Sequence, residues 1–246
     1  TWAEIFDRGS VLNTHPGWAA VVWWLVVTVA GWLAFPLLYM ALPHLRDRGY
    51  GVSRIFALLL VAYLTWWVAS LRVLPNTRLT IIRMVLVLAI AGGWVAWSKW
   101  GELKGFVRRR WKDLVLVEVL FAVLYVGWIG VRLAHPDLWH SHMGGEKPMD
   151  LAYLNAVIKS TWFPPYNPWF AGFALNYYYF GFVVVGSWTK LIGTDPAIAY
   201  NLVVPLLYAL TGMAAFSVAC NLFGGNRRGA ILAGVMALLF TVVLGN

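Results

Sequence analysis

Long apolar runs recur along this chain and constrain its fold more than any other feature. Each run has about 20 residues, enough for an α-helix to cross a bilayer core of roughly 30 Å. There are seven such runs, at residues 17–42, 53–74, 78–98, 113–133, 173–192, 197–222 and 229–245. The chain is 61% hydrophobic and 12% charged, about half the charged share of a soluble domain. We therefore expect an all-α, polytopic transmembrane protein of about seven spans.

The net charge of +9 comes largely from basic residues in the turns between these runs. Such residues set topology and meet anionic headgroups, so we expect membrane lipids as partners and no nucleic acid. The most basic turn, 99–112, carries six lysines and arginines against one glutamate, and the turn at 43–54 carries three arginines. Two spans separate these turns, so both should be cytoplasmic in a plasma membrane. The long segment 134–172 is then extracytoplasmic.

Two other basic turns disagree with this topology, because seven spans would place them outside. One is bracketed by Arg72, Arg78 and Arg83, and the other holds Arg227 and Arg228. They are either tolerated exceptions or outward arginines that bind an anionic lipid or phosphate, which guanidinium groups contact in a bidentate manner.

The segment 134–172 interrupts the apolar pattern with polar, proline and aromatic residues. Six of the chain's ten acidic and five histidine residues lie near its start: His135, Asp137, His140, His142, Glu146 and Asp150. Helix-breaking prolines and glycines predict an irregular 134–148. The stretch DLAYLNAVIKS that follows predicts a short amphipathic helix lying in the membrane interface, with Leu151, Leu154, Val157 and Ile158 on its apolar face.

Structural and metal-binding roles are alternatives for these polar residues. Asp150 fits the first turn of a helix, where a carboxylate meets the helix dipole, and Glu146 could pair with Lys147. His140 and His142, with Asp137, are weaker candidates for a site that holds a divalent metal such as Zn²⁺ or Mn²⁺. Hydrogen bonding at the interface is the favoured role for the histidines.

Residues 144–181 read GGEKPMDLAYLNAVIKSTWFPPYNPWFAGFALNYYYFG. This order of an acidic motif, a proline–aromatic segment and a triple tyrosine resembles the hallmark of the YYY-domain membrane proteins of bacteria and archaea. The resemblance covers 113–246, so we divide the chain into a three-span scaffold or docking module at 1–112 and the start of a YYY domain at 113–246. The triple tyrosine covers more than one helix face, so at least one of its members should serve packing.

The YYY-domain family is similar in turn to GT-C glycosyltransferases, which use polyprenyl-phosphate sugars. This resemblance implies that spans four to seven begin a GT-C-like core that transfers a sugar on the extracytoplasmic face. Glu146 or Asp150 would act as the base, and their spacing of four, where the family has an adjacent pair, leaves the choice open. Lys147 or Arg132 would hold the phosphate of the lipid donor. Substrate contacts would come from Tyr153, Trp162, Tyr166, Tyr177, Tyr178 and Tyr179. No cofactor beyond the lipid donor is implied, with a divalent metal as the alternative.

A non-catalytic subunit of a membrane complex is the second hypothesis. The first three spans hold many tryptophans, and aromatic residues are enriched at protein interfaces. Trp24, Trp32, Trp66 and Trp67 lie far from span ends and should face another protein helix, a pigment or a lipid. Gly31, Gly92 and Gly93 favour close helix packing. Transport ranks third, because the runs show no mid-span ionisable residue suited to an ion path.

Overall fold

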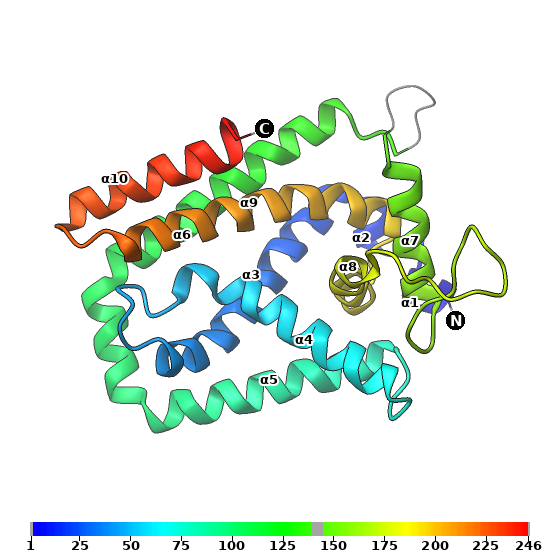
Figure 1. The fold of residues 1–246 in the computed structure, drawn as a ribbon, viewed down its shortest axis with the longest axis horizontal. Coiled ribbons are helices and arrows are strands. Elements are labelled where there is room, and N and C mark those ends of the chain that lie inside the picture. The colour runs from blue at the N-terminus through cyan, green and yellow to red at the C-terminus, as the bar shows by residue number, and fades with distance from the viewer. Residues whose placement is uncertain (1, 139–144, 246) are drawn as a thin grey trace. The chain divides into compact units, whose positions relative to one another are not determined.

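The computed structural model describes residues 2–138 and 145–245, which form helices and turns with no β-strand (Figure 1). Within these residues, five helices are long and apolar enough to cross a membrane: α3 (Pro16–Ala41), α4 (Ser53–Ser70), α5 (Arg78–Ser98), α6 (Trp100–Ala134) and α9 (Pro196–Leu222). The shorter helices are α1 (Trp2–Ile5), α2 (Val11–Thr14), η1 (Tyr50–Val52), α7 (Lys147–Lys159), α8 (Tyr179–Ile192), α10 (Arg227–Leu238) and the π-helix η2 (Leu239–Val243). The prediction of an all-α polytopic membrane protein is confirmed.

The chain divides into two compact units, each built from three separate stretches of sequence. The first unit holds Thr1–Val26, Leu58–Val87 and Ala134–Val203, and the second holds Val27–Ala57, Leu88–Leu133 and Val204–Asn246. Helices α7 and α8 belong to the first unit and α10 to the second, whereas α3, α4, α5 and α9 contribute residues to both.

Two of the seven expected spans do not form long helices. The run at 173–192 yields α8, which has only 14 residues because irregular chain precedes it and Gly193, in the left-handed conformation, ends it. The run at 229–245 yields the 12-residue α10, which continues as the five-residue η2. Apolar composition alone therefore overestimated the number of helices that can span.

Both ends of α8 lie at the same end of the α4–α5 pair. Near the end of α4, the Trp66 indole N–H donates to the Tyr179 hydroxyl at the start of α8, with 3.1 Å between the atoms. At the start of α5, Arg78 Nε donates to the carbonyl oxygen of Leu191 at the end of α8, again at 3.1 Å. Only the turn 71–77 separates α4 from α5, so α8 runs across this end of the pair instead of along it.

The position of the turn before α10 corrects the expected topology. The Arg46 guanidinium donates to the Gly225 carbonyl oxygen, and the Arg46 backbone N–H donates to Asn221 Oδ1 at 2.7 Å. Within the second unit, the turns at 43–54 and 223–226 therefore lie side by side. Arg227 and Arg228 therefore lie at the same end of the second unit as the arginines of the turn at 43–54, so they no longer conflict with the charge pattern of the basic turns.

The core of the first unit forms where α7 packs on α8. Val157 of α7 is buried with Phe163 and Val183, and Leu154 and Ile158 are buried against Phe6. Gly186 on α8 permits this approach: a Cβ there would lie 3.2 Å from Val157 Cγ1. Most of the predicted apolar face of this helix is thus covered by protein.

Close helix approach also organises the second unit. A Cβ on Gly92 would fall 2.0 Å from the Leu33 carbonyl oxygen, so α5 meets the α3 backbone with no room for a side chain. At Gly31 a Cβ would fall 2.8 Å from Arg54 Cγ, whereas Gly93 has open space around it. The predicted role of glycine therefore holds at Gly31 and Gly92.

Candidate functional site

The start of α7 positions the two candidate carboxylates. Glu146 stands at the N-cap, Pro148 lies in the first turn, where proline is well tolerated, and Asp150 completes that turn. The Asp150 carboxylate accepts a hydrogen bond from the Tyr200 hydroxyl on α9, with 3.0 Å between the oxygens. Asp150 is half-buried and Glu146 is exposed. Asp150 is thus held toward a neighbouring helix, and its side chain does not cap α7.

Two exposed tyrosines lie next to this turn. The rings of Tyr177 and Tyr178 are 4.2 Å apart between centroids, and their exposed fractions are 51% and 78%. Partial desolvation, then the Tyr178 phenol, and then the Glu146 carboxylate raise the pKa of Tyr177. Glu146 and this tyrosine pair therefore share one electrostatic environment at the surface of the first unit. We call Glu146, Asp150, Tyr177, Tyr178 and Tyr200 the loop site.

The third tyrosine of the triplet serves packing, as expected. Tyr179 accepts the hydrogen bond from Trp66, and its ring stacks on Phe163 with 6.3 Å between centroids. Tyr178, whose φ is 40°, adopts the left-handed conformation immediately before α8. That backbone turn separates the exposed tyrosines from the packed one.

The other predicted substrate contacts are scattered. Tyr153 is 7% exposed with its ring edge-on to Phe182, so it lies in the core. Trp162 is half-buried, and Tyr166 is exposed beside a short bridge to Ala174. Of these three, Tyr166 is the one placed to meet a ligand from solution.

The two predicted phosphate ligands, Lys147 and Arg132, belong to different units. Lys147 Nζ donates to the Asp137 carbonyl oxygen at 3.4 Å, and it stands three residues before Asp150 on the same side of α7. Arg132 lies in the last turn of α6, in the second unit. Lys147 is therefore the predicted phosphate ligand that belongs to the same unit as the loop site.

The metal hypothesis falls largely outside the described residues, because His140 and His142 lie in 139–144. Within 2–138 and 145–245, no group of three or more histidine, cysteine, aspartate or glutamate side chains could hold an ion. Asp137 itself is exposed.

Asn76 joins three segments of the first unit. Its side-chain amide donates to the carbonyl oxygens of Val157 and Ser160 at 3.1 and 3.0 Å, and its backbone N–H donates to Thr161 at 2.8 Å. The Asn76 carbonyl oxygen accepts from the buried ammonium of Lys190 on α8. The turn before α5, the end of α7 and α8 are thus locked to one another.

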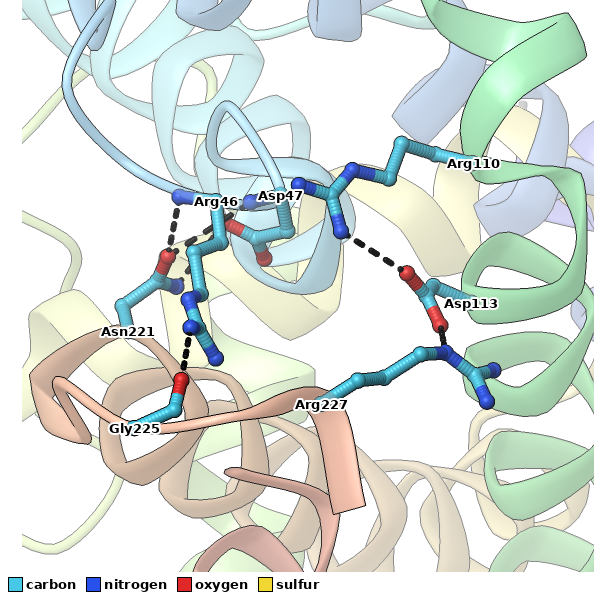
Figure 2. A network of polar contacts seen from close by, with 7 residues as sticks. All are labelled: Arg46, Asp47, Arg110, Asp113, Asn221, Gly225 and Arg227. Carbon is cyan, nitrogen blue, oxygen red and sulfur yellow. Dashed lines mark hydrogen bonds and ion pairs between the residues drawn. The ribbon is translucent and has the colours of Figure 1, made fainter. Parts of the chain in front are cut away.

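A second polar cluster, which was not predicted from the sequence, lies in the second unit (Figure 2). The Asp47 carboxylate accepts hydrogen bonds from four groups: Ser217 Oγ at 2.7 Å, Asn221 Nδ2 at 2.9 Å, Gly49 N at 3.0 Å and Gly51 N at 3.1 Å. Asp47 and Asn221 are 174 positions apart, so no local pattern links them. The one available signal was an aspartate within the basic turn at 43–54.

A cavity of about 250 Å³ lies beside this cluster, wholly within the second unit. Its polar wall includes Arg46, Asp47, Arg110, Asp113 and Arg227. Its apolar wall is made by Phe106, Leu114, Val117, Phe216, Cys220 and Ala230. We call this cavity the arginine pocket.

An ion pair inside the second unit corrects the expectation that the spans hold no mid-span ionisable residue. Glu118 of α6 pairs with Arg54 of α4, which is 3% exposed, and also accepts a hydrogen bond from the Tyr50 hydroxyl. Arg54 lies over the Phe121 ring, 4.3 Å from its centroid. Glu118 was visible as an acidic residue within the run at 113–133.

Five long apolar helices among the described residues define a polytopic helical membrane protein. The family model described as "Uncharacterized membrane protein (DUF2298)" matches residues 60–246, and the chain belongs to that family. The match begins within α4, upstream of residue 113, where the sequence resemblance starts. No match was found among the curated proteins or among the solved structures.

Proposed function

We propose that the loop site transfers a sugar from a polyprenyl-phosphate donor to an acceptor hydroxyl on the extracytoplasmic face of the membrane. The observation that carries this proposal is the Asp150 carboxylate, which is held by Tyr200 at 3.0 Å beside an exposed carboxylate and two exposed tyrosines. General-base catalysis needs a carboxylate that is oriented by a neighbour and still reachable by the acceptor. The GT-C resemblance supplies the reaction class.

In this proposal Asp150 accepts the proton of the acceptor hydroxyl while that oxygen attacks the anomeric carbon. The bond from the anomeric carbon to the phosphate oxygen breaks, and the polyprenyl phosphate leaves with the electron pair. Lys147, one turn before Asp150, stabilises the charge on the leaving phosphate. Tyr177, Tyr178 and Tyr166 offer ring faces and hydroxyls to the sugar.

The test replaces the carboxylates without changing their size. The variants are expressed in a strain that lacks the native gene. We expect Asp150→Asn to lower the rate at which the dependent glycan or glycolipid forms by about 10²–10⁴-fold, the usual effect of removing a general base. Tyr200→Phe, which removes only the hydrogen bond, should cause a smaller loss. Asp7→Asn is the matched control, because Asp7 is an exposed carboxylate of the same unit. Normal profiles from Asp150→Asn and Glu146→Gln together would refute catalysis here.

A non-catalytic role in a complex remains the second proposal, and exposed tryptophans favour it. Trp67 is 49% exposed and Trp32 is 41% exposed, whereas Trp66 packs within its own chain against Tyr63, Tyr179 and Phe180. Trp32 and Trp67 are therefore the residues to change. Native mass measurement after gentle extraction should show an assembly that Trp32→Leu and Trp67→Leu dissociate, and that Trp97→Leu at a helix end leaves intact.

A further inference from the structure

The arginine pocket joins a charged mouth to an apolar wall. Arg110 Nη1 and Arg227 Nε both donate to the Asp113 carboxylate, at 3.3 and 2.6 Å (Figure 2). One carboxylate thus serves two guanidinium groups, which leaves a net positive charge at the mouth. Each guanidinium has five N–H donors, so most of them stay free to bind a ligand.

Asp47 offsets part of this positive charge but not all of it, because three arginines face two aspartates around the pocket. Its carboxylate is already engaged by Ser217, Asn221 and two backbone N–H groups, so it holds the turn in place. Arg46 donates to the Gly225 carbonyl oxygen and is held by a neutral group. Three arginines from α6, α10 and the turn before η1 therefore surround one space.

A wider cavity of about 600 Å³ adjoins the pocket and shares Arg110, Asp113 and Arg227 with it. Its remaining lining residues are Arg109, Trp111 and Lys112. The positive charge therefore extends from the pocket onto the outer surface of the N-terminal part of α6, where a large headgroup has room.

The apolar wall and the flanking tryptophans indicate a lipid. α6 has 35 residues and is about 50 Å long, more than one bilayer crossing, so its first turns extend past the hydrocarbon core. Trp100 and Trp111 on these turns are exposed, as expected at headgroup level. A phosphate at the arginines would leave the apolar wall of Phe106 and Phe216 to an acyl chain.

We propose that the arginine pocket binds the phosphate of an anionic phospholipid, with the first part of an acyl chain along its apolar wall. The site is separate from the loop site and does not depend on the sugar-transfer proposal. Guanidinium groups in pairs contact phosphate oxygens in a bidentate manner, so arginine suits this position better than lysine would.

The experiment measures retention of phosphatidylglycerol by the delipidated full-length protein in native mass spectrometry. Arg110→Gln combined with Arg227→Gln should weaken binding at least tenfold. The matched control is Arg108→Gln with Arg228→Gln, which removes equal charge from the same two helices at positions that line neither cavity. Equal retention by the two double variants would overturn the proposal, and so would equally tight binding of phosphatidylcholine.

Two further measurements complete the test. The Asp113→Asn variant distinguishes lipid binding from a structural role of the ion pairs, and competition by inorganic phosphate distinguishes a lipid ligand from free phosphate. Asp113→Asn removes the same ion pairs and keeps both guanidinium groups, so phosphatidylglycerol should bind as well as before or better. Loss of binding in Asp113→Asn would mean that the ion pairs only maintain the fold, against the proposal. Inorganic phosphate should compete weakly, and binding of phosphate alone as tightly as the lipid would overturn the assignment of the lipid.

Discussion

Lys190 places a charged group in the interior of the first unit. It is 4% exposed, and burial lowers its pKa from 10.5 to about 8. A charged lysine at this position opposes folding at neutral pH by at most about 3–4 kcal/mol, because each pKa unit corresponds to about 1.4 kcal/mol. Its hydrogen bond to the Asn76 carbonyl oxygen is the local compensation.

This buried lysine predicts a stability that rises with pH. Between pH 8 and 10.5 the unfolded chain holds a proton that the folded chain has released, so the free energy of unfolding increases across this window. Lys190→Met should abolish that increase in thermal midpoints measured from pH 7 to pH 10. Lys159→Met, at an exposed position near the Trp2 ring, should keep it. An identical pH dependence in both variants would rule out Lys190 as the titrating group.

We expect removal of the Asp47 carboxylate to lower the stability of the folded protein strongly. Asp47→Ala leaves Ser217, Asn221 and two backbone N–H groups without their acceptor, so we expect a loss of about 2–4 kcal/mol in stability. Asp7→Ala, whose carboxylate accepts one backbone N–H from Gly9 at 2.9 Å, should cost under about 1 kcal/mol. Unfolding in detergent by denaturant measures both, and similar losses would show that the Asp47 cluster is not a stabilising centre.

At the scale of helices, the neighbouring glycines on α5 make a matched pair. Gly92→Ala would place a Cβ 2.0 Å from the Leu33 carbonyl oxygen, so α5 and α3 must separate, at a cost of about 2 kcal/mol or more. Gly93→Ala meets open space and should be neutral or slightly stabilising, because alanine favours helix. Thermal midpoints of the two variants decide this, and equal midpoints would mean that the close approach does not exist.

Helix formation was predictable where length and composition agreed, and was mispredicted where local chain geometry intervened. α3, α4, α5 and α9 follow directly from their apolar runs. α6 begins at Trp100, before its run at 113–133, so the basic stretch expected to be a turn at 99–112 is almost wholly helical. α8 does not span, because the proline–aromatic segment delays its start until Tyr179 and Gly193 ends it. The loop site is partly local: Glu146, Asp150 and the tyrosines share one stretch of sequence, whereas Tyr200 comes from α9. The arginine pocket joins three distant segments, so no spacing pattern could reveal it.

At the scale of the whole molecule, the topology follows from α8. Five helices that can cross, with α8 across one end, place the turn 223–226 beside the turn 43–54, as the contact between Arg46 and Gly225 requires. We therefore expect the turns at 43–54 and 223–226 and the basic start of α6 to lie on the cytoplasmic side. Among the described residues, the short turn 71–77 is then the basic segment that we expect on the opposite side.

This arrangement predicts the labelling of single cysteines on a Cys220→Ser background. Gly224→Cys and Gly101→Cys have open space around them and should react with an impermeant maleimide from the same side of the membrane. Thr161→Cys, at an exposed position after α7, should react from the opposite side. Labelling of Gly224→Cys together with Thr161→Cys would mean that α8 crosses after all.

The anchor at Asn76 depends on backbone atoms of its neighbours. Its amide and N–H donate to main-chain oxygens of Val157, Ser160 and Thr161, and its own main-chain oxygen receives Lys190. The identities of the side chains at 157 and 161 therefore do not enter these bonds. The exposed side chain at 161 is therefore free to change while the join is kept, whereas Val157 also packs in the core against Phe163 and Val183. An engineered variant that grafts a different loop onto α7 needs to preserve Asn76, Val157 and Lys190 together with the path of the main chain.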